Sequence, residues 1–289
     1  MAITAQQVKE LRERTGAGMM ECKTVLSEAN GDMDGAIDLL RKRGLAKADK
    51  KAGRVAAEGV VMVASSADQR KAVIVELNCE TDFVAKNDDF VAFAKRCAEA
   101  ALANAATLQD LATGDIEETR KGLVSKLGEN IALRRVRHLG ADAGRVGTYL
   151  HGSRIGVLVA VRGEVSEDLG RDLAMHVAAS RPEVVNPQDV SADRVEKEKE
   201  ILIAQAADSG KPRDIIEKMI SGRMSKFLNE IAFTGQPFVK NPDQTVGDLL
   251  KASGNATVLE FVRYEVGEGI EKAPTADFAS EVMAQVRGS

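Results

Sequence analysis

Two strand–turn–strand patterns, each followed by an amphipathic helix, organise the middle of this chain and recur at a spacing of roughly eighty residues. The strands and helix of the first copy lie at 59–64, 72–77 and 90–101, and those of the second copy lie at 145–150, 155–161 and 169–180. Because a hairpin has an apolar face that must be covered, each helix is expected to pack on its own hairpin. The sequence therefore predicts an α+β protein whose core consists of two related hairpin-plus-helix subdomains with antiparallel sheets.

The segment before the first hairpin predicts three short helices. Thr4 and Gln7 fit the capping box that begins the first helix, and glycines or Asn-Gly follow each helical stretch, the last of them Gly44. The second helix presents Met19, Cys22, Val25, Leu26 and Ala29 at helical spacing. Residues 45–55 are basic, rich in alanine and without apolar periodicity, which predicts a linker.

The segment after the second hairpin is interrupted at Pro182 and Pro187. Two amphipathic stretches, 191–209 and 212–232, then predict an antiparallel helical hairpin inserted into the second subdomain. The chain returns through a strand at 258–266 and ends in a further amphipathic helix. The predicted domains are a three-helix bundle (1–44), a linker (45–55), a first core subdomain (56–140), a second core subdomain (141–182 and 233–266), the helical hairpin (183–232) and a C-terminal helical module (267–289).

Composition limits the classes of function. The chain has no Trp and only 3% aromatic residues, so side chains that stack on nucleic-acid bases are scarce. Residues 1–54 nevertheless hold 11 Lys and Arg against 8 Asp and Glu, with most of the excess in 41–54. This basic run fits a solvated linker, a surface that steers an acidic partner, or an RNA-binding segment. We favour no direct nucleic-acid binding, and an RNA-binding accessory protein of translation is the alternative.

Targeting and catalytic signals are also informative. The sequence shows no secretory leader and no apolar run near the ~18 residues of a membrane span, so a cytoplasmic protein without membrane contact is expected. Its cysteines lack a CxxC spacing, and its three histidines lie in no nucleophile motif. We therefore expect inert, partly buried thiols, no metal or cofactor and no enzymatic activity. A cysteine- or metal-dependent enzyme is the second alternative.

The junction between the first hairpin and its helix carries an aromatic ring beside a carboxylate, Phe83 next to Asp82. Such a ring either packs into its own core or enters a partner, and Asp82 alone fits a helix cap or a solvated carboxylate better than a metal site. The equivalent junction of the second copy, 162–168, has no aromatic residue. The shared fold therefore does not require the ring, which favours a functional role for the 81–84 loop, formed by Thr81, Asp82, Phe83 and Val84.

The sequence Thr81-Asp82-Phe83-Val84-Ala85-Lys86 resembles the signature of the bacterial elongation factor Ts family, the nucleotide-exchange factors of the GTPase elongation factor Tu. Segments 8–23, 151–159, 174–180 and 234–239 resemble the same family. The five matches occur in the family's order over nearly the whole chain. The resemblance implies exchange of GDP for GTP on elongation factor Tu, which the chain would bind in its GDP-bound and nucleotide-free states.

The resemblance also implies roles for particular residues. The 81–84 loop would enter the GTPase near its Mg²⁺, with Phe83 wedged between partner helices. The N-terminal bundle would be a ubiquitin-associated-like docking module, with one of its adjacent methionines exposed. The family's partner-binding surfaces map onto Arg12, Met19, Met20, His151 and Phe278. His176 is instead expected to be packed or hydrogen-bonded, and a homodimer or a two-to-two assembly stays open.

Overall fold

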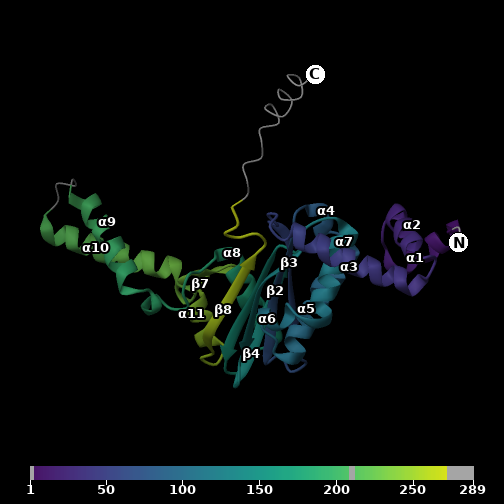
Figure 1. Cartoon of the computed structure of the whole chain (residues 1–289). Helices are drawn as coiled ribbons and strands as arrows, with labels where there is room; N and C mark the ends of the chain where they lie inside the picture. Colours follow the sequence, from purple (N-terminus) through teal and green to yellow (C-terminus); the bar gives the residue numbers. More distant parts are fainter. Residues whose placement is uncertain (1–2, 208–211, 272–289) are drawn as a thin grey trace, which may run out of the picture. The chain divides into compact units, whose positions relative to one another are not determined.

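The computed structural model describes residues 3–207 and 212–271 (Figure 1). It is a mixture of helices and antiparallel sheets, which confirms the predicted α+β class. The described chain divides into two compact units, one comprising 3–62, 75–136 and 265–271 and the other 63–74 and 137–264. Within the described ranges, no helix is both long enough and apolar enough to cross a membrane. The domain boundaries drawn from the sequence stay a prediction.

The first unit begins with α1 (Ala5–Thr15), α2 (Met19–Glu28) and α3 (Met33–Lys51). Thr4 and Gln7 form the expected reciprocal capping box, and the Asp32 carboxylate accepts hydrogen bonds from the first turn of α3. The three helices share a core formed by Val8, Leu11, Cys22, Val25, Leu26, Ala36 and Leu40. The described chain thus begins with three helices around one small apolar core.

The predicted end of the third helix is wrong. The helix expected to stop at Gly44 continues to Lys51, so most of the predicted linker is helical. On both sides of Gly44, α3 packs on α7 (Gly114–Leu127): Arg41 pairs with Glu118, and Asp49 of the extension lies 3.6 Å from Lys121. These tertiary contacts outweigh the helix penalty of about 1 kcal/mol for an internal glycine.

The first sheet has the order β1-β2-β3, with β1 (Glu58–Ser65), β2 (Lys71–Cys79) and β3 (Ala132–Gly140). Gly59 has φ +146°, and a Cβ there would lie 2.1 Å from the Leu77 carbonyl oxygen, so only glycine fits this approach of the two strands. Between β2 and β3 lie α4 (Asp82–Ala85), α5 (Asp88–Asn104), α6 (Leu108–Leu111) and α7. The buried face of α5 includes Phe90, Phe93, Ala94 and Cys97, as its apolar periodicity predicts.

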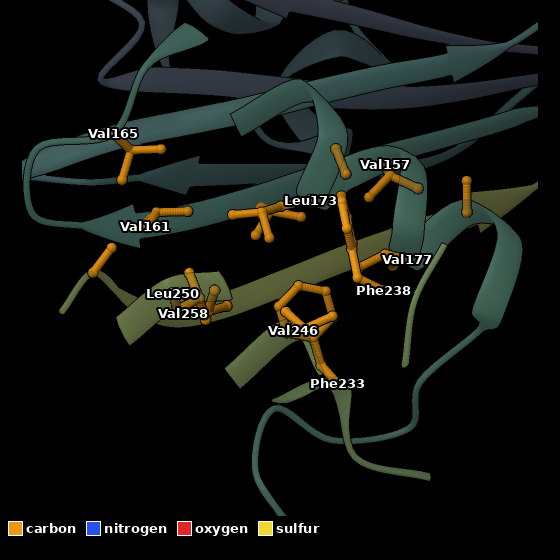
Figure 2. Packing of buried hydrophobic residues seen from close by; sticks show 14 residues of the cluster. Val157, Val161, Val165, Leu173, Val177, Phe233, Phe238, Val246, Leu250 and Val258 are labelled. Carbon is orange, nitrogen blue, oxygen red and sulfur yellow. The ribbon is translucent and has the colours of Figure 1, made fainter. Parts of the chain in front are cut away.

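The second unit contains the sheet β4-β5-β8, with β4 (Gly144–His151), β5 (Ile155–Arg162) and β8 (Thr257–Glu265). The antiparallel register of its hairpin runs from Gly144 opposite Arg162 to His151 opposite Ile155. His151 is thus the last residue of β4, one position beyond the strand at 145–150 that the sequence predicted. Figure 2 shows the core of this unit, where Leu173 and Val177 of α8 (Glu167–Ser180) lie among strand residues such as Val157 and Val161.

The inserted segment consists of η1 (Pro187–Asp189), α9 (Ala192–Ala207) and α10 (Arg213–Ile231), and α9 and α10 lie side by side (Figure 1). Leu202 and Ala206 of α9 are buried, whereas α10 has no fully buried residue. The remaining elements are η2 (Phe233–Gly235), β6 (Pro237–Phe238), β7 (Asn241–Thr245) and α11 (Val246–Ala252). The predicted C-terminal helix with Phe278 lies outside the described residues.

Candidate functional site: the exposed 81–84 loop

The 81–84 loop contains one helical turn, which the sequence did not predict. Its cap is Thr81, whose hydroxyl accepts a hydrogen bond from the Val84 N–H at 3.4 Å. Asp82 is the first residue inside the turn, not its cap, and its carboxylate lies 2.7 Å from the Lys86 ammonium. Asn87 then caps α5, so two consecutive caps hold a short turn in place between β2 and α5.

The ring of Phe83 is 82% exposed, the largest exposure among the large hydrophobic side chains of the described chain. Transfer of a Phe side chain from water into an apolar environment is favourable by about 1.5–3 kcal/mol. The ring gains little of this energy from its own fold. The alternative in which Phe83 plugs the core of its own domain is therefore wrong, and the ring is available to another molecule. Val84, by contrast, is buried and anchors the turn.

The backbone that enters the turn is held by the segment before β3. One carboxylate oxygen of Glu129 accepts hydrogen bonds from the N–H groups of Glu80 and Thr81 at 3.0 and 2.9 Å, and the other accepts from the Thr81 hydroxyl at 2.6 Å. In return, the Glu80 carboxylate accepts from the Asn130 N–H at 2.6 Å. No local sequence signal links these two acids, because they are 49 residues apart in the chain.

A second exposed apolar surface lies on the N-terminal helices. Met19 and Met20 are 60% and 73% exposed, so both side chains are accessible to a partner, although Met19 shares the helical spacing of the buried Cys22 and Val25. Both line a groove of about 610 Å³ with the exposed Arg12. The remaining lining residues are Ile3, Ala5, Val8, Lys9 and Lys23. An apolar floor with a basic rim suits an amphipathic, acidic partner surface.

The two histidines singled out by the sequence lie in different environments. His151 is exposed, with its Nδ1 3.2 Å from the Tyr149 hydroxyl. His176 is fully buried, as expected. Its Nδ1 accepts from the Val239 N–H at 3.2 Å and its Nε2 lies 2.9 Å from the Gln236 amide oxygen, so the proton belongs on Nε2. Burial lowers the pKa of His176, although the Gln236 hydrogen bond acts in the opposite direction.

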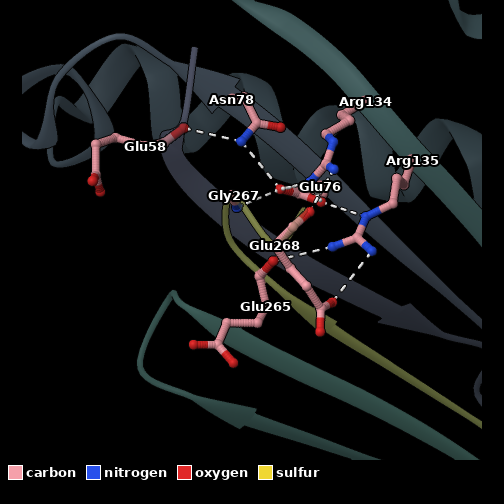
Figure 3. Close-up of polar contacts among 8 residues, drawn as sticks. All are labelled: Glu58, Glu76, Asn78, Arg134, Arg135, Glu265, Gly267 and Glu268. Atoms are coloured by element: carbon pink, nitrogen blue, oxygen red, sulfur yellow. Dashed lines mark hydrogen bonds and ion pairs between the residues drawn. The ribbon is translucent and has the colours of Figure 1, made fainter. Parts of the chain in front are cut away.

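A buried acid on β2 organises the polar interior of the first unit (Figure 3). The carboxylate of Glu76 accepts from Arg135 Nε at 2.5 Å, from Arg134 Nη1 at 3.1 Å and from the Gly267 N–H at 2.9 Å. Burial alone would raise the Glu76 pKa, but these donors outweigh it and hold the pKa below its ordinary value. A charged residue inside the apolar run of 72–77 was the available sequence signal.

The cysteines Cys22, Cys79 and Cys97 are free and buried, as expected for inert thiols. Burial raises the pKa of Cys79 and of Cys97 to about 12, so neither is a thiolate near neutral pH. In the described ranges, no group of three or more His, Cys, Asp or Glu side chains is placed to hold a metal ion.

The basic run of α3 is not a strip of free cations. Arg41 pairs with Glu118, Arg43 lies 2.6 Å from Glu28, and the Lys51 ammonium donates to the Gly128 carbonyl. Partners of this kind lower the positive potential that a phosphate backbone would meet. Three cations of this run are therefore bound to groups of the same chain.

The prominent exposed features are thus a rigidly held aromatic turn and an apolar groove, which define a protein that acts by binding another protein. The family described as Elongation factor TS matches residues 80–268. Elongation factor Ts of Acidithiobacillus ferrooxidans is 70% identical over 100% of both chains, and those of Methylococcus capsulatus and Thioalkalivibrio sulfidiphilus are 56% and 57% identical over 100% of both. The chain belongs to the elongation factor Ts family.

Proposed function

We propose that the 81–84 loop is the part of this chain that acts on the nucleotide site of elongation factor Tu. As a member of the elongation factor Ts family, the chain is a nucleotide-exchange factor of translation elongation, which releases GDP from its partner so that GTP can bind. The observation that supports the loop assignment is the 82% exposure of Phe83 on a turn whose backbone is otherwise fixed.

The proposed mechanism uses the ring as a wedge. Phe83 gains its burial energy only when it enters the partner, and the rigid turn transmits that energy into movement of partner helices. Mg²⁺ neutralises the phosphates of bound GDP, so displacing it exposes like charges to one another and weakens nucleotide binding. GDP and this chain then weaken each other's binding by one coupling free energy.

The groove on the N-terminal helices supplies affinity in this proposal. Met19, Met20 and Arg12 form a docking surface in a bundle of ubiquitin-associated type, and His151 adds a contact on the second unit.

The two three-stranded sheets, each with a hairpin followed by a helix, support an internal duplication of which only the first copy carries the ring. We place this activity in the cytoplasm, with α9 and α10 available for a separate contact.

Stopped-flow release of a fluorescent GDP analogue from elongation factor Tu tests the assignment. Phe83→Ala and Asp82→Ala should lower the maximal release rate strongly while changing the dissociation constant less. Circular dichroism and melting curves serve as controls for folding. Wild-type release rates in both variants would show that the loop is not the exchange element.

A further inference from the structure

We propose that Glu129 is the positioning residue of the 81–84 loop, which it holds in the geometry needed for exchange without itself contacting the partner. This inference rests on the proposed function of the loop. It starts from the arrangement of donors around one side chain: two consecutive N–H groups and one hydroxyl, all from Glu80 and Thr81, converge on the two oxygens of a single carboxylate.

These three hydrogen bonds act at the point where the chain leaves β2. The N–H groups of Glu80 and Thr81 have no strand partner once β2 ends at Cys79, and Glu129 replaces that partner. Hydrogen bonds to a charged acceptor are the stronger kind and are directional. The carboxylate therefore fixes both the backbone before the turn and the hydroxyl that caps it, and so the direction in which Phe83 leaves the surface.

The segment carrying Glu129 is itself anchored. The side-chain amide of Asn130 donates to the carbonyls of Ala52 and Arg54 at 3.3 and 2.8 Å, and the Gly128 carbonyl accepts from Lys51. Asn130 is 4% exposed, so these bonds are shielded from water. Glu129 thus connects the turn to a fixed point of the same unit and not to another mobile side chain.

The ring and the acid make different contributions in this scheme. Phe83 supplies the burial energy, whereas Glu129 ensures that the ring arrives in one orientation. Removing the acid should leave docking intact and allow the turn to populate unproductive directions. A variant without the carboxylate should therefore show a lower maximal rate of GDP release. The concentration of this chain that gives half of that maximal rate should not change, because only the step after docking is impaired.

The experiment compares Glu129→Ala, Glu129→Gln and Glu129→Asp in the full chain, with Glu99→Ala as the matched control. Glu99 is an exposed acid of α5 whose ion pair, within the part of the chain that the structure describes, is with Lys95 at 3.8 Å. We expect about a tenfold or greater loss of maximal GDP release for Ala. Gln keeps the length and an acceptor for the backbone N–H groups and should restore most of the rate, whereas the shorter Asp should restore little. Hydrogen exchange of the Glu80 and Thr81 amides should accelerate in Ala and much less in Gln.

Phe83→Ala and the double variant with Glu129→Ala separate this inference from the proposed function. If Phe83→Ala releases GDP at the wild-type rate, the loop assignment itself fails. If Phe83→Ala is slow but Glu129→Ala is normal, or if Gln is as defective as Ala, only the positioning role fails. A double variant no slower than Phe83→Ala supports the proposal, since the acid then acts through the ring. Should Glu129→Ala fail to fold, the maximal release rates of the other two variants decide. A faster rate for Glu129→Gln than for Glu129→Asp supports the positioning role, and the opposite order contradicts it.

Discussion

Phe83 and Val84 are neighbours on one helical turn, yet the ring is 82% exposed and the valine is 9% exposed. The turn therefore separates two tasks between consecutive residues. Val84 fastens the turn to the protein, and Phe83 projects from it. A sequence motif that reads as a single block of four residues is, in the structure, an anchor and a protruding group.

This division predicts opposite phenotypes for two similar truncations. Phe83→Ala should leave the melting temperature unchanged within error and strongly slow GDP release from elongation factor Tu. Val84→Ala should destabilise the protein by about 1–3 kcal/mol, since it removes buried methyl groups. Urea unfolding and stopped-flow release measured on the same samples distinguish them. Equal loss of stability in both variants would contradict the separation of tasks.

The groove on the N-terminal helices predicts an effect on affinity. Replacing Met19 and Met20 together by Ala should raise the dissociation constant for elongation factor Tu by about tenfold or more, because exposed apolar anchors commonly dominate an interface. The maximal release rate should stay near the wild-type value. Titration calorimetry gives the affinity, and Leu259→Ala, which truncates another exposed aliphatic side chain at 39% exposure, is the control. Wild-type affinity in the double variant would remove the groove from the docking surface.

The Glu76 network predicts a sensitivity to acid. The pKa of Glu76 is held below the ordinary value of about 4.3. The contribution of Glu76 to the free energy of unfolding is therefore fully present at pH values above that ordinary pKa. The contribution is lost as the pH falls through the folded-state pKa. Glu76→Ala leaves Arg134 and Arg135 without their buried partner and should cost about 3–5 kcal/mol at neutral pH. Chemical denaturation measured from pH 7 to pH 3 should then show that acid lowers the free energy of unfolding less in the variant than in the wild type.

His176 predicts a second pH dependence with its own window. Its pKa is lowered in the folded state, so the unfolded chain binds the proton more readily. The contribution of neutral His176 to stability should therefore be fully present at pH values above its ordinary pKa of about 6.5. Stability should decline as the pH falls from that value to the folded-state pKa. Thermal melts of the wild type and His176→Gln between pH 8 and pH 5 test this. If the melting temperatures of the wild type and the variant changed in parallel over this whole pH range, the predicted pH dependence would be refuted.

The buried thiols predict slow modification. Cys79 and Cys97 combine burial with a pKa of about 12, so the native protein should react with iodoacetamide far more slowly than the urea-unfolded chain. Mass spectrometry of the two samples over time gives the comparison. Rapid modification of Cys79 in the native state would show that the base of the 81–84 loop opens. Because the buried thiols of the native protein should stay unmodified, exchange activity should survive treatment with iodoacetamide.

Local patterns predicted several elements well. The reciprocal capping of α1 by Thr4 and Gln7 follows from four adjacent residues, and the hairpin of β4 and β5 follows from apolar runs around a short polar turn. Gly44 shows where such reasoning fails. Its helix penalty is local, but the packing of α3 on α7 that overcomes the penalty involves residues more than seventy positions away.

The sequence by itself determined the family, the α+β class and the identity of Phe83 as the unusual residue of its junction, because motifs and periodicities are local. Only the tertiary structure decided that the ring faces solvent while Val84 does not, that both Met19 and Met20 are exposed, and that Glu129 closes the base of the loop. Exposure and hydrogen-bond partnership depend on which distant segments fold against a residue. No window of neighbouring residues contains that information.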